Sequence, residues 1–336
     1  MKAAVWNGQS RLGVESRPDP DPKPGETLVR VVRTGICGSD LHFFRGDFRP
    51  LTGVAPGHEI AGIVEGGDGP APGTAVAVNP LLGCMKCPDC GAGNPQLCAR
   101  RVLTGMDIPG GLQQLLAIRA DNVHPLPAGI DPRLGSLTEP LAVALHAVHV
   151  AGVPHGARGL VLGAGTVGLM CVLLARDVCS EVAVTARYPH QREAALAFGA
   201  SHVFEPGSMD LRRWAKSRRP DAVFETVGGH AETLKEALLS VRAGGTVVAL
   251  GVFTADPVIP ALRLVNDDIR LLGAIMYGHS GRTTEFAQAV ELLPKYREEL
   301  PRLQSASYPL ASANAAFEHA LDKSRNALKV SVLPNE

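Results

Sequence analysis

The chain has 336 residues, with 33 Lys and Arg balanced by 33 Asp and Glu, so its formal net charge is zero. Because no long run of one sign occurs, nucleic acid and anionic membranes are not expected partners. The N-terminus becomes polar too soon for a secretory signal. The apolar run 159–175 is shorter than the roughly 20 residues that a bilayer requires. We therefore expect a cytoplasmic protein, and the length predicts two domains.

The first 140 residues predict a compact, β-rich, barrel-like domain. Short apolar segments alternate with turns rich in Gly and Pro. Three of these segments predict strands, at 29–32, 60–64 and 74–78. The unbroken apolar stretch 141–150 then predicts a helix.

The middle of the chain alternates strands with helices. Such alternation implies right-handed crossovers and a parallel sheet covered on both faces, the α/β doubly wound Rossmann-type fold. Within it, the pairs Arg212-Arg213 and Arg218-Arg219 flank Trp214, and we interpret them as a solvated helix face. The predicted strands are 160–162, 182–185, 202–204, 222–225, 246–250 and 269–274, with helices at 166–176, 190–198 and 231–241.

The end of the chain predicts one more helix, at 283–293, and a strand, at 328–333. We expect this tail to return to the β-rich domain. The predicted domains are then 1–141 with 277–336, and 142–276.

The run Gly163-Ala164-Gly165-Thr166-Val167-Gly168 follows a predicted strand and opens a predicted helix. In that context G-x-G-x-x-G is typical of dinucleotide binding. Gly163 permits the tight turn, Gly165 lets the backbone approach a pyrophosphate, and Gly168 lets helix and strand pack closely. Thr166 and Val167 begin the helix whose N–H groups would meet the phosphates. An ordinary glycine-rich turn is the alternative.

The residues after the second strand of this region bear on the choice between NAD and NADP. NAD enzymes usually place Asp or Glu about 20 residues past the glycines, where it bonds the ribose 2′-hydroxyl. This chain has Ala186 there, followed by Arg187 and, about one helical turn further on, Arg192. A guanidinium can bind a 2′-phosphate through two hydrogen bonds, and Tyr188 could stack beside the adenine. We therefore expect NADP(H) rather than NAD(H).

Four cysteines follow the pattern C-x2-C-x2-C-x7-C: Cys84, Cys87, Cys90 and Cys98. In a reducing compartment, clustered cysteines indicate metal more often than disulfides. Four thiolates satisfy tetrahedral zinc and leave no open position. We expect a structural zinc that holds this loop in shape.

A second, mixed set of ligands is spread along the chain. Cys37, His58 and Glu139 offer a thiolate, an imidazole and a carboxylate, all sound zinc ligands. Three such ligands plus water make an open, catalytic site. Taken singly, His58 could be structural and Glu139 could cap the helix that follows. Their occurrence together with the cysteine loop and the dinucleotide motif favours a catalytic zinc.

Five motifs occur in the order found in one known family, and the chain resembles the zinc-dependent medium-chain dehydrogenases/reductases over essentially its whole length. It is most similar to the sorbitol, threonine and butanediol dehydrogenase branch. The resemblance implies that the β-rich part is a GroES-like catalytic domain. The motifs are Gly35-Ile36-Cys37-Gly38-Ser39-Asp40, Gly57-His58-Glu59, the cysteine loop 84–98, Glu139-Pro140-Leu141-Ala142 and the glycine motif 163–168.

The resemblance also implies roles for single residues. Branch members differ over whether the carboxylate after His or the one before Pro binds the catalytic zinc, so Glu59 and Glu139 are both candidates, one at a time. Asp40 would orient the ligand histidine. Ser39 would take the substrate hydroxyl proton and pass it toward solvent through the cofactor ribose and His42. A surface-loop side chain is the alternative for His42.

These features predict a zinc-dependent alcohol or polyol dehydrogenase with two zinc ions per chain. Zinc would polarise the oxygen of the substrate, and the nicotinamide would exchange hydride with a secondary alcohol or, in reverse, with a carbonyl compound. Relatives are dimers or tetramers, so a homodimer or homotetramer is expected. A reductase of C=C or C=N bonds on the same scaffold and a non-catalytic NADP-binding protein are the alternatives.

Overall fold

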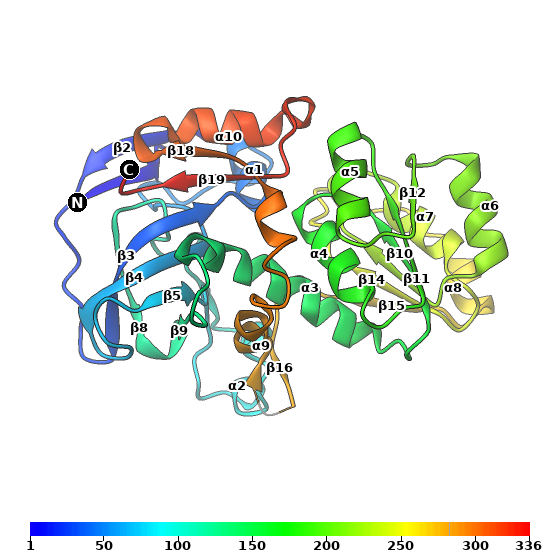
Figure 1. Cartoon of the computed structure of the whole chain (residues 1–336), viewed down its shortest axis with the longest axis horizontal. Helices are drawn as coiled ribbons and strands as arrows, with labels where there is room; N and C mark the ends of the chain where they lie inside the picture. Colours follow the sequence, from blue (N-terminus) through cyan, green and yellow to red (C-terminus); the bar gives the residue numbers. More distant parts are fainter. Residues whose placement is uncertain (282) are drawn as a thin grey trace. The chain divides into compact units, whose positions relative to one another are not determined.

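The computed structural model describes residues 1–281 and 283–336 (Figure 1). These residues form two compact units. The first unit comprises Met1–Glu139 and Gly278–Glu336, and the second comprises Pro140–Tyr277. Each unit has buried hydrophobic clusters of its own.

The first unit is built on a seven-stranded sheet with the order β18-β19-β3-β4-β5-β9, in which β8 also pairs with β3. Alternate residues of β3 are buried, because Val29 and Val31 pack with Ile60 and Val64 on one face. β19 pairs with β3, although the two strands lie near opposite ends of the chain (Figure 1). The strands are β3 (Glu26–Gly35), β4 (Glu59–Gly67), β5 (Ala75–Val78), β8 (Leu115–Arg119), β9 (Val123–Pro125), β18 (Gln304–Pro309) and β19 (Lys329–Leu333).

Helices and hairpins complete the first unit. Helices α1 and α10 pack through Phe44 and Phe317, whose ring centroids lie 5.2 Å apart, and Trp6 lies 5.7 Å from Phe317. The helices are α1 (Gly38–Arg45), α2 (Pro88–Gly91), α9 (Glu285–Leu292) and α10 (Ala313–Leu321). The short strands are β1 (Lys2–Trp6), β2 (Leu12–Ser16), β6 (Leu81–Leu82), β7 (Val102–Leu103), β16 (His279–Ser280) and β17 (Thr283–Thr284).

The second unit contains a six-stranded parallel sheet with the order β12-β11-β10-β13-β14-β15. The strand order reverses between β10 and β13, which is where doubly wound sheets bind their ligands. The predicted fold class, a Rossmann-type sheet together with a β-rich GroES-like domain, is confirmed. The strands are β10 (Arg158–Leu162), β11 (Glu181–Thr185), β12 (His202–Phe204), β13 (Ala222–Glu225), β14 (Thr246–Ala249) and β15 (Arg270–Gly273).

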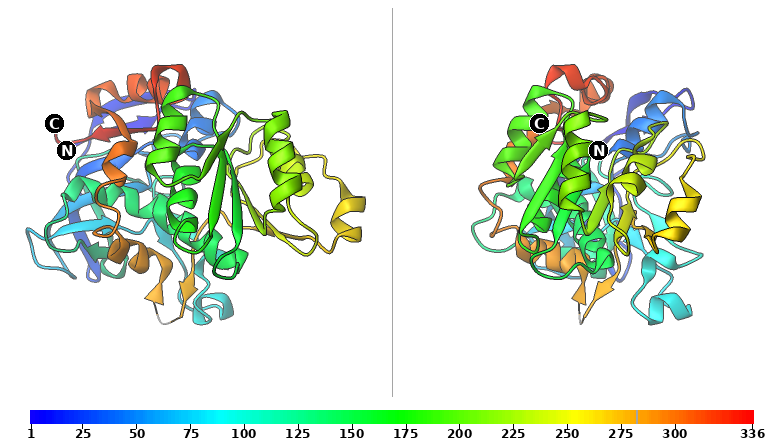
Figure 2. Two further views of the ribbon diagram at one scale, coloured as in Figure 1. Left: turned by 45° about the vertical axis from the view of Figure 1, so that its right-hand side comes forward. Right: turned by 90° about the vertical axis from the view of Figure 1, so that its right-hand side faces the viewer.

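Helices cover both faces of this sheet (Figure 2). Leu160 and Val223 of the sheet pack with Leu211 and Leu238 of the helices in one buried cluster. Helix α4 is buried from Gly168 to its end. This fits its sequence, because a helix that is apolar on all sides must be covered on all sides. The helices are α4 (Thr166–Ala175), α5 (Pro189–Ala197), α6 (Met209–Arg218), α7 (Thr233–Ser240) and α8 (Ala261–Asn266).

Helix α3 (Thr138–Ala151) begins earlier than the sequence predicts. The 3₁₀ helix Pro132–Leu137 leads directly into it, and Thr138 already has helical dihedral angles. Glu139 therefore lies in the first turn, and the expectation that it caps a later start is wrong. Pro140 does not break the helix because first-turn N–H groups have no partner within the helix. By length and composition the stretch 132–151 could cross a membrane, but 78% of its most apolar window is buried in the structure.

Candidate active site and metal centres

The side chains of Cys37, His58 and Glu59 meet in the first unit. Their ligand atoms lie within 4.8 Å of one another. Cys37 follows the end of β3 and His58 precedes the start of β4, and these strands pair antiparallel with Gly35 opposite Glu59. A Cβ atom at Gly35 would lie 1.9 Å from a carboxylate oxygen of Glu59, so only glycine fits there. Strand pairing thus closes the gap of 21 residues between the thiol and the imidazole.

Asp40 holds the backbone and the histidine of this group. One carboxylate oxygen accepts a hydrogen bond of 2.9 Å from the Cys37 N–H, at the start of α1. The other oxygen lies 3.7 Å from Nδ1 of His58. Burial raises the pKa of Asp40, against the opposing effect of His58. The pKa of His58 lies well above its usual value because Asp40 and the Cys37 thiol outweigh the effect of its burial.

Lys329, from β19, is the residue of this site that the sequence analysis missed. Its Nζ donates hydrogen bonds to both carboxylate oxygens of Glu59, at 2.6 and 2.7 Å, and to the Ile36 carbonyl at 3.1 Å. Lys329 is 2% exposed and Glu59 is 1% exposed. Burial opposes the charge of Lys329, but the neighbouring anions, Glu59 first, raise its pKa. A lysine within the apolar stretch 327–333 was the signal that could have identified it.

Glu139 lies near this group but outside it. Among residues 1–281 and 283–336, the set within 4.8 Å holds Cys37, His58 and Glu59 and not Glu139. Burial raises the pKa of Glu139 to about 7, and among the charges that act on it are those of His58 and Glu59. The structure therefore brings one of the two candidate carboxylates into the ligand set and leaves the other beside it.

Ser39 and His42 share one face of α1, three residues apart. His42 is 9% exposed, so its interpretation as a surface-loop side chain is wrong. Its Nδ1 lies 2.7 Å from a carboxylate oxygen of Asp47, and its ring lies 5.6 Å from that of Phe48. The sequence analysis missed Asp47, although its position just after α1 was visible.

The four cysteines of the loop 84–98 also converge, with their sulfur atoms within 4.8 Å of one another. None of the described cysteines forms a disulfide. Hydrogen-bond donors point at these sulfurs: the Cys90 N–H toward Cys87 at 3.5 Å, and Arg100 toward Cys98 and Cys84 at 3.3 Å each. Arg100 was not predicted. Four convergent, donor-stabilised sulfurs fit tetrahedral zinc, and the thiol, imidazole and carboxylate of the first group fit an open zinc site.

The glycine motif has the geometry of a phosphate-binding turn. Gly163 has a φ of 104°, which favours glycine, and its N–H donates a 2.9 Å hydrogen bond to Oγ1 of Thr185. A Cβ atom at Gly168 would lie 2.0 Å from the Gly163 carbonyl oxygen, so helix and strand could not pack as closely with any other residue. Gly165 precedes the first residue of α4, Thr166, at the strand-order reversal. The N-terminus of α4, with Thr166 and Val167, therefore offers its N–H groups and positive dipole end to an anion.

The two arginines expected to select the cofactor differ in their surroundings. Ala186 is buried and Arg187 is exposed directly after β11. Arg192 instead forms a 2.5 Å ion pair with Glu205. Tyr188 precedes α5, and its ring stacks on that of His190 at 5.7 Å. Arg187 is therefore the cation best placed for a 2′-phosphate.

Comparison with known proteins identifies the class. The chain matches the alcohol dehydrogenase GroES-like domain at residues 23–128 and the zinc-binding dehydrogenase domain at residues 166–295. It therefore belongs to the zinc-dependent medium-chain dehydrogenases/reductases, and within them to the sorbitol dehydrogenase-like branch. The chain is thus an alcohol dehydrogenase of the kind that uses zinc and a nicotinamide cofactor, which confirms the predicted family and enzyme class.

Individual relatives cover nearly the whole chain. The chain is 32% identical over 327 residues to the 2-dehydro-3-deoxy-L-galactonate 5-dehydrogenase of Pseudoalteromonas atlantica, covering 94% of each. It is 30% identical over 350 residues to the sorbitol dehydrogenase of Bacillus subtilis, covering 100% of the chain and 98% of the relative. A zinc-binding dehydrogenase of Sinorhizobium meliloti, solved with NADP bound, superimposes with a TM-score of 0.90 at 30% identity, covering 99% of both chains.

Proposed function

We propose that this enzyme interconverts a secondary alcohol of a polyol or sugar acid and the corresponding ketone, with NADP(H) as the preferred cofactor. The convergence of Cys37, His58 and Glu59 carries the proposal, because a mixed S, N, O donor set suits an open zinc site. Relatives named for sorbitol, L-idonate and galactonate derivatives support the substrate class.

We assign Cys37, His58 and Glu59 as the ligands of the catalytic zinc, with Glu139 beside them. When bound, zinc supplies Lewis-acid polarisation of the substrate oxygen, and the nicotinamide supplies the hydride acceptor or donor. Asp40 lies beside the His58 ring, and Lys329 holds the buried Glu59 carboxylate through two hydrogen bonds. Glu139, with a pKa of about 7, can hold or release a proton near neutral pH.

The proton of the substrate hydroxyl leaves by way of Ser39 and His42. Their shared face on α1 supports this path, and the Asp47 carboxylate at 2.7 Å stabilises the imidazolium that forms when His42 receives the proton. Two features of the site disfavour the two alternative functions. A C=C or C=N reductase has no need of a hydroxyl-to-histidine path, and a non-catalytic binding protein has no need of an open ligand set.

The NADP preference rests on Arg187, exposed after β11 where a carboxylate would exclude a 2′-phosphate. Removing the Arg187 side chain removes a charge-assisted hydrogen bond to the 2′-phosphate, which is worth about 1.5–3 kcal/mol. Arg187→Ala should therefore raise the KM for NADP roughly 10- to 100-fold. The KM for NAD should barely change. Arg192→Ala is the matched control, because that guanidinium is held by Glu205. Equal effects of both variants on NADP would contradict the assignment.

Two zinc ions per chain, a homo-oligomer and a cytoplasmic location complete the proposal. The second zinc is supported by the convergent cysteine loop, and the location by the seven unpaired thiols.

A second copy of the chain is supported by large apolar side chains near β15, at the edge of the parallel sheet: Val258, Leu262, Val265 and Ile275 are 81, 75, 72 and 55% exposed. Light scattering on Leu262→Glu should show loss of the oligomer.

The decisive experiment is a substrate screen combined with metal analysis. Purified enzyme should contain two zinc atoms per chain and oxidise polyols or sugar acids with NADP faster than simple monoalcohols. Cys37→Ser should lose activity while keeping the cysteine-loop zinc. Retained activity in that variant, or activity confined to C=C or C=N substrates, would overturn the proposal.

A further inference from the structure

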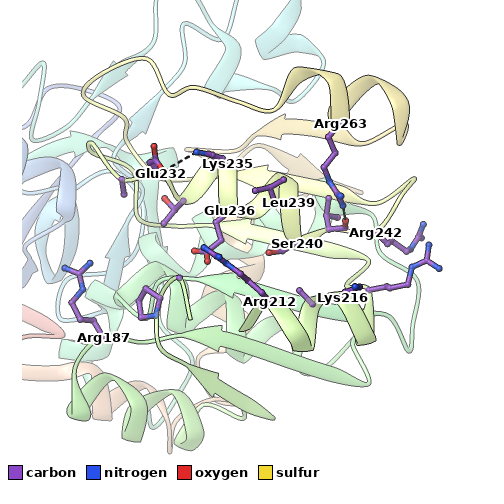
Figure 3. Close-up of a pocket in the computed structure, with 17 residues that line it drawn as sticks. Arg187, Arg212, Lys216, Glu232, Lys235, Glu236, Leu239, Ser240, Arg242 and Arg263 are labelled. Carbon is purple, nitrogen blue, oxygen red and sulfur yellow. Dashed lines mark hydrogen bonds and ion pairs between the residues drawn. The ribbon is translucent and has the colours of Figure 1, made fainter. Parts of the chain in front are cut away.

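A pocket of about 980 Å³ lies in the second unit and is lined by residues of α6 and α7 (Figure 3). Nothing in the proposed reaction uses most of it. Two acidic side chains, Glu232 and Glu236, line it. Seven cationic side chains do so as well: Arg187, Arg212, Lys216, Arg219, Lys235, Arg242 and Arg263. In a chain of zero net charge, this is a marked local excess of positive charge.

Three of the cations are already engaged. Arg242 pairs with Asp221 at 2.6 Å, and Lys235 with Glu232 at 3.4 Å. Arg263 donates to the carbonyl groups of Leu238 and Val241 at 2.7 Å each. These contacts join α7 to α8 and to the loop before β13, and they account for the charges of Arg242, Lys235 and Arg263.

The cations of α6 are not engaged in this way. Within the residues that the structure describes, the side chains of Lys216 and Arg219 make no hydrogen bond or ion pair. Arg212 has the carboxylate of Glu236 as a neighbouring opposite charge. Arg212 and Lys216 stand at positions i and i+4 on one face of α6, and Arg219 is the residue that ends the helix. We refer to these three cations as the α6 stripe.

The other two arginines of α6 provide an internal comparison. Arg213 pairs with Asp210 at 3.3 Å, and Arg218 lies 3.7 Å from Glu181. The four arginines are all exposed, as a solvated helix face requires, but within the described residues only Arg213 and Arg218 form ion pairs with carboxylates.

Helix stability does not explain the stripe. Like charges four residues apart on one face repel each other. Arg212 stands near the N-terminus of α6, where a cation opposes the helix dipole. Arg219 has a φ of 52°, the left-handed conformation in which glycine is the usual residue after a helix. An anion in the pocket would relieve the repulsion and use all three charges.

The spacing points to the kind of anion. At 1.5 Å per residue, the four steps from Arg212 to Lys216 span about 6 Å along α6, and Arg219 lies just beyond the end of the helix. Linked phosphates carry a charge at every link, so they can use cations spread along the pocket, whereas a single phosphate offers one point of charge. Guanidinium groups bind phosphate through two hydrogen bonds, and lysine binds it as a point charge. We propose that the pocket between α6 and α7 binds an oligophosphate, either free or as the phosphate chain of a nucleotide.

The pocket also includes Arg187, which the proposed function assigns to the 2′-phosphate of NADP. Negative charge bound along the stripe would repel a second phosphate in the same pocket. By linkage, NADP should then weaken oligophosphate binding more than NAD does. The inference thus adds a second ligand to the cofactor-binding unit and goes beyond the proposed reaction.

Calorimetric titration of the zinc-loaded full chain with inorganic tripolyphosphate tests the proposal. We expect saturable binding to one site, at least tenfold tighter than that of inorganic phosphate. The double variant R212A/K216A should weaken it at least tenfold. R213A/R218A removes the same charge from the same helix and should change it less than twofold. Circular dichroism and the thermal midpoint show that both variants are folded.

Two further measurements identify the kind of oligophosphate and test the oligophosphate site separately from the proposed function. ATP binding that exceeds tripolyphosphate binding, yet falls equally in R212A/K216A, identifies a nucleotide, and equal affinities identify the phosphate chain alone. Arg187→Ala tests the cofactor proposal independently through the KM for NADP. The oligophosphate site is overturned if both double variants bind tripolyphosphate alike or if no saturable binding occurs.

Discussion

The two groups of candidate metal ligands in the first unit have their charges balanced by different neighbours. The cysteine loop takes four sulfurs from one short segment, and its donors are backbone N–H groups and the exposed Arg100. The catalytic group takes side chains from α1, β4 and β19 and places Glu59 and Lys329 almost wholly out of solvent. A change in the loop should therefore affect metal content and local order. A change in the catalytic group should upset a balance of buried charges.

The largest expected effect is at Lys329. Lys329→Met leaves the buried Glu59 without its cation, and removing one partner of a buried ion pair costs about 3–5 kcal/mol of the free energy of unfolding. Urea denaturation measures this loss. The double variant K329M/E59Q should recover much of the stability, because no unpaired charge then remains, while activity stays low.

Lys323 offers a matched control for that experiment. Burial, then the neighbouring Lys329, lowers the pKa of Lys323 to about 8, so the fold favours the charge of Lys323 less than water does. Lys323→Met should cost far less stability than Lys329→Met. If the two variants lose equal stability, the buried pair with Glu59 is not what distinguishes the catalytic group.

The next effect is on catalysis. His42→Ala should lower kcat about 100-fold at neutral pH, within the range found for loss of a proton-transfer group. Asp47→Asn keeps the imidazole of His42 but removes its carboxylate partner, so kcat should fall by a smaller factor. Both variants should keep two zinc atoms per chain. Loss of zinc from either one would show that α1 supports the metal site rather than the proton path.

The cysteine loop should respond more mildly. Cys98→Ser should lower the zinc content from two to one per chain and the thermal midpoint by roughly 5 °C, since the sheet core does not depend on this loop. Activity per remaining zinc should persist. Cys179→Ser, which changes a cysteine outside both groups, should keep both zinc atoms. A Cys98→Ser enzyme that loses all activity would remove the distinction between the two groups.

The same contrast explains what could be predicted from the sequence. The cysteine loop was predictable because its ligand spacing is local, and the six strands of the second unit because buried parallel strands are short apolar runs. Cys37 and His58 required strand pairing or family resemblance to join them. Lys329 was missed because its partner lies 270 residues away. The arginines with carboxylate partners could not be told from those that line the pocket, since Glu181, the partner of Arg218, lies on a strand distant in the sequence.

The smallest effect tests how a partly solvated carboxylate differs from the buried Glu59. Burial alone would raise the pKa of Asp221, but the Arg158 N–H and the Arg242 guanidinium together lower it. A carboxyl with a lowered folded-state pKa stabilises the fold above its unfolded value of about 3.9, and this stability is lost as the pH falls through the folded value. Asp221→Asn should therefore cost about 1 kcal/mol at pH 7, because solvent screens the pair. This loss of unfolding free energy in Asp221→Asn should shrink below about pH 4. Glu59→Gln leaves Lys329 buried without its anion, so it should cost several times more at pH 7. Chemical denaturation at pH 7 and pH 3.5 measures both, and a similar cost for the two variants at pH 7 would show that burial does not set the difference.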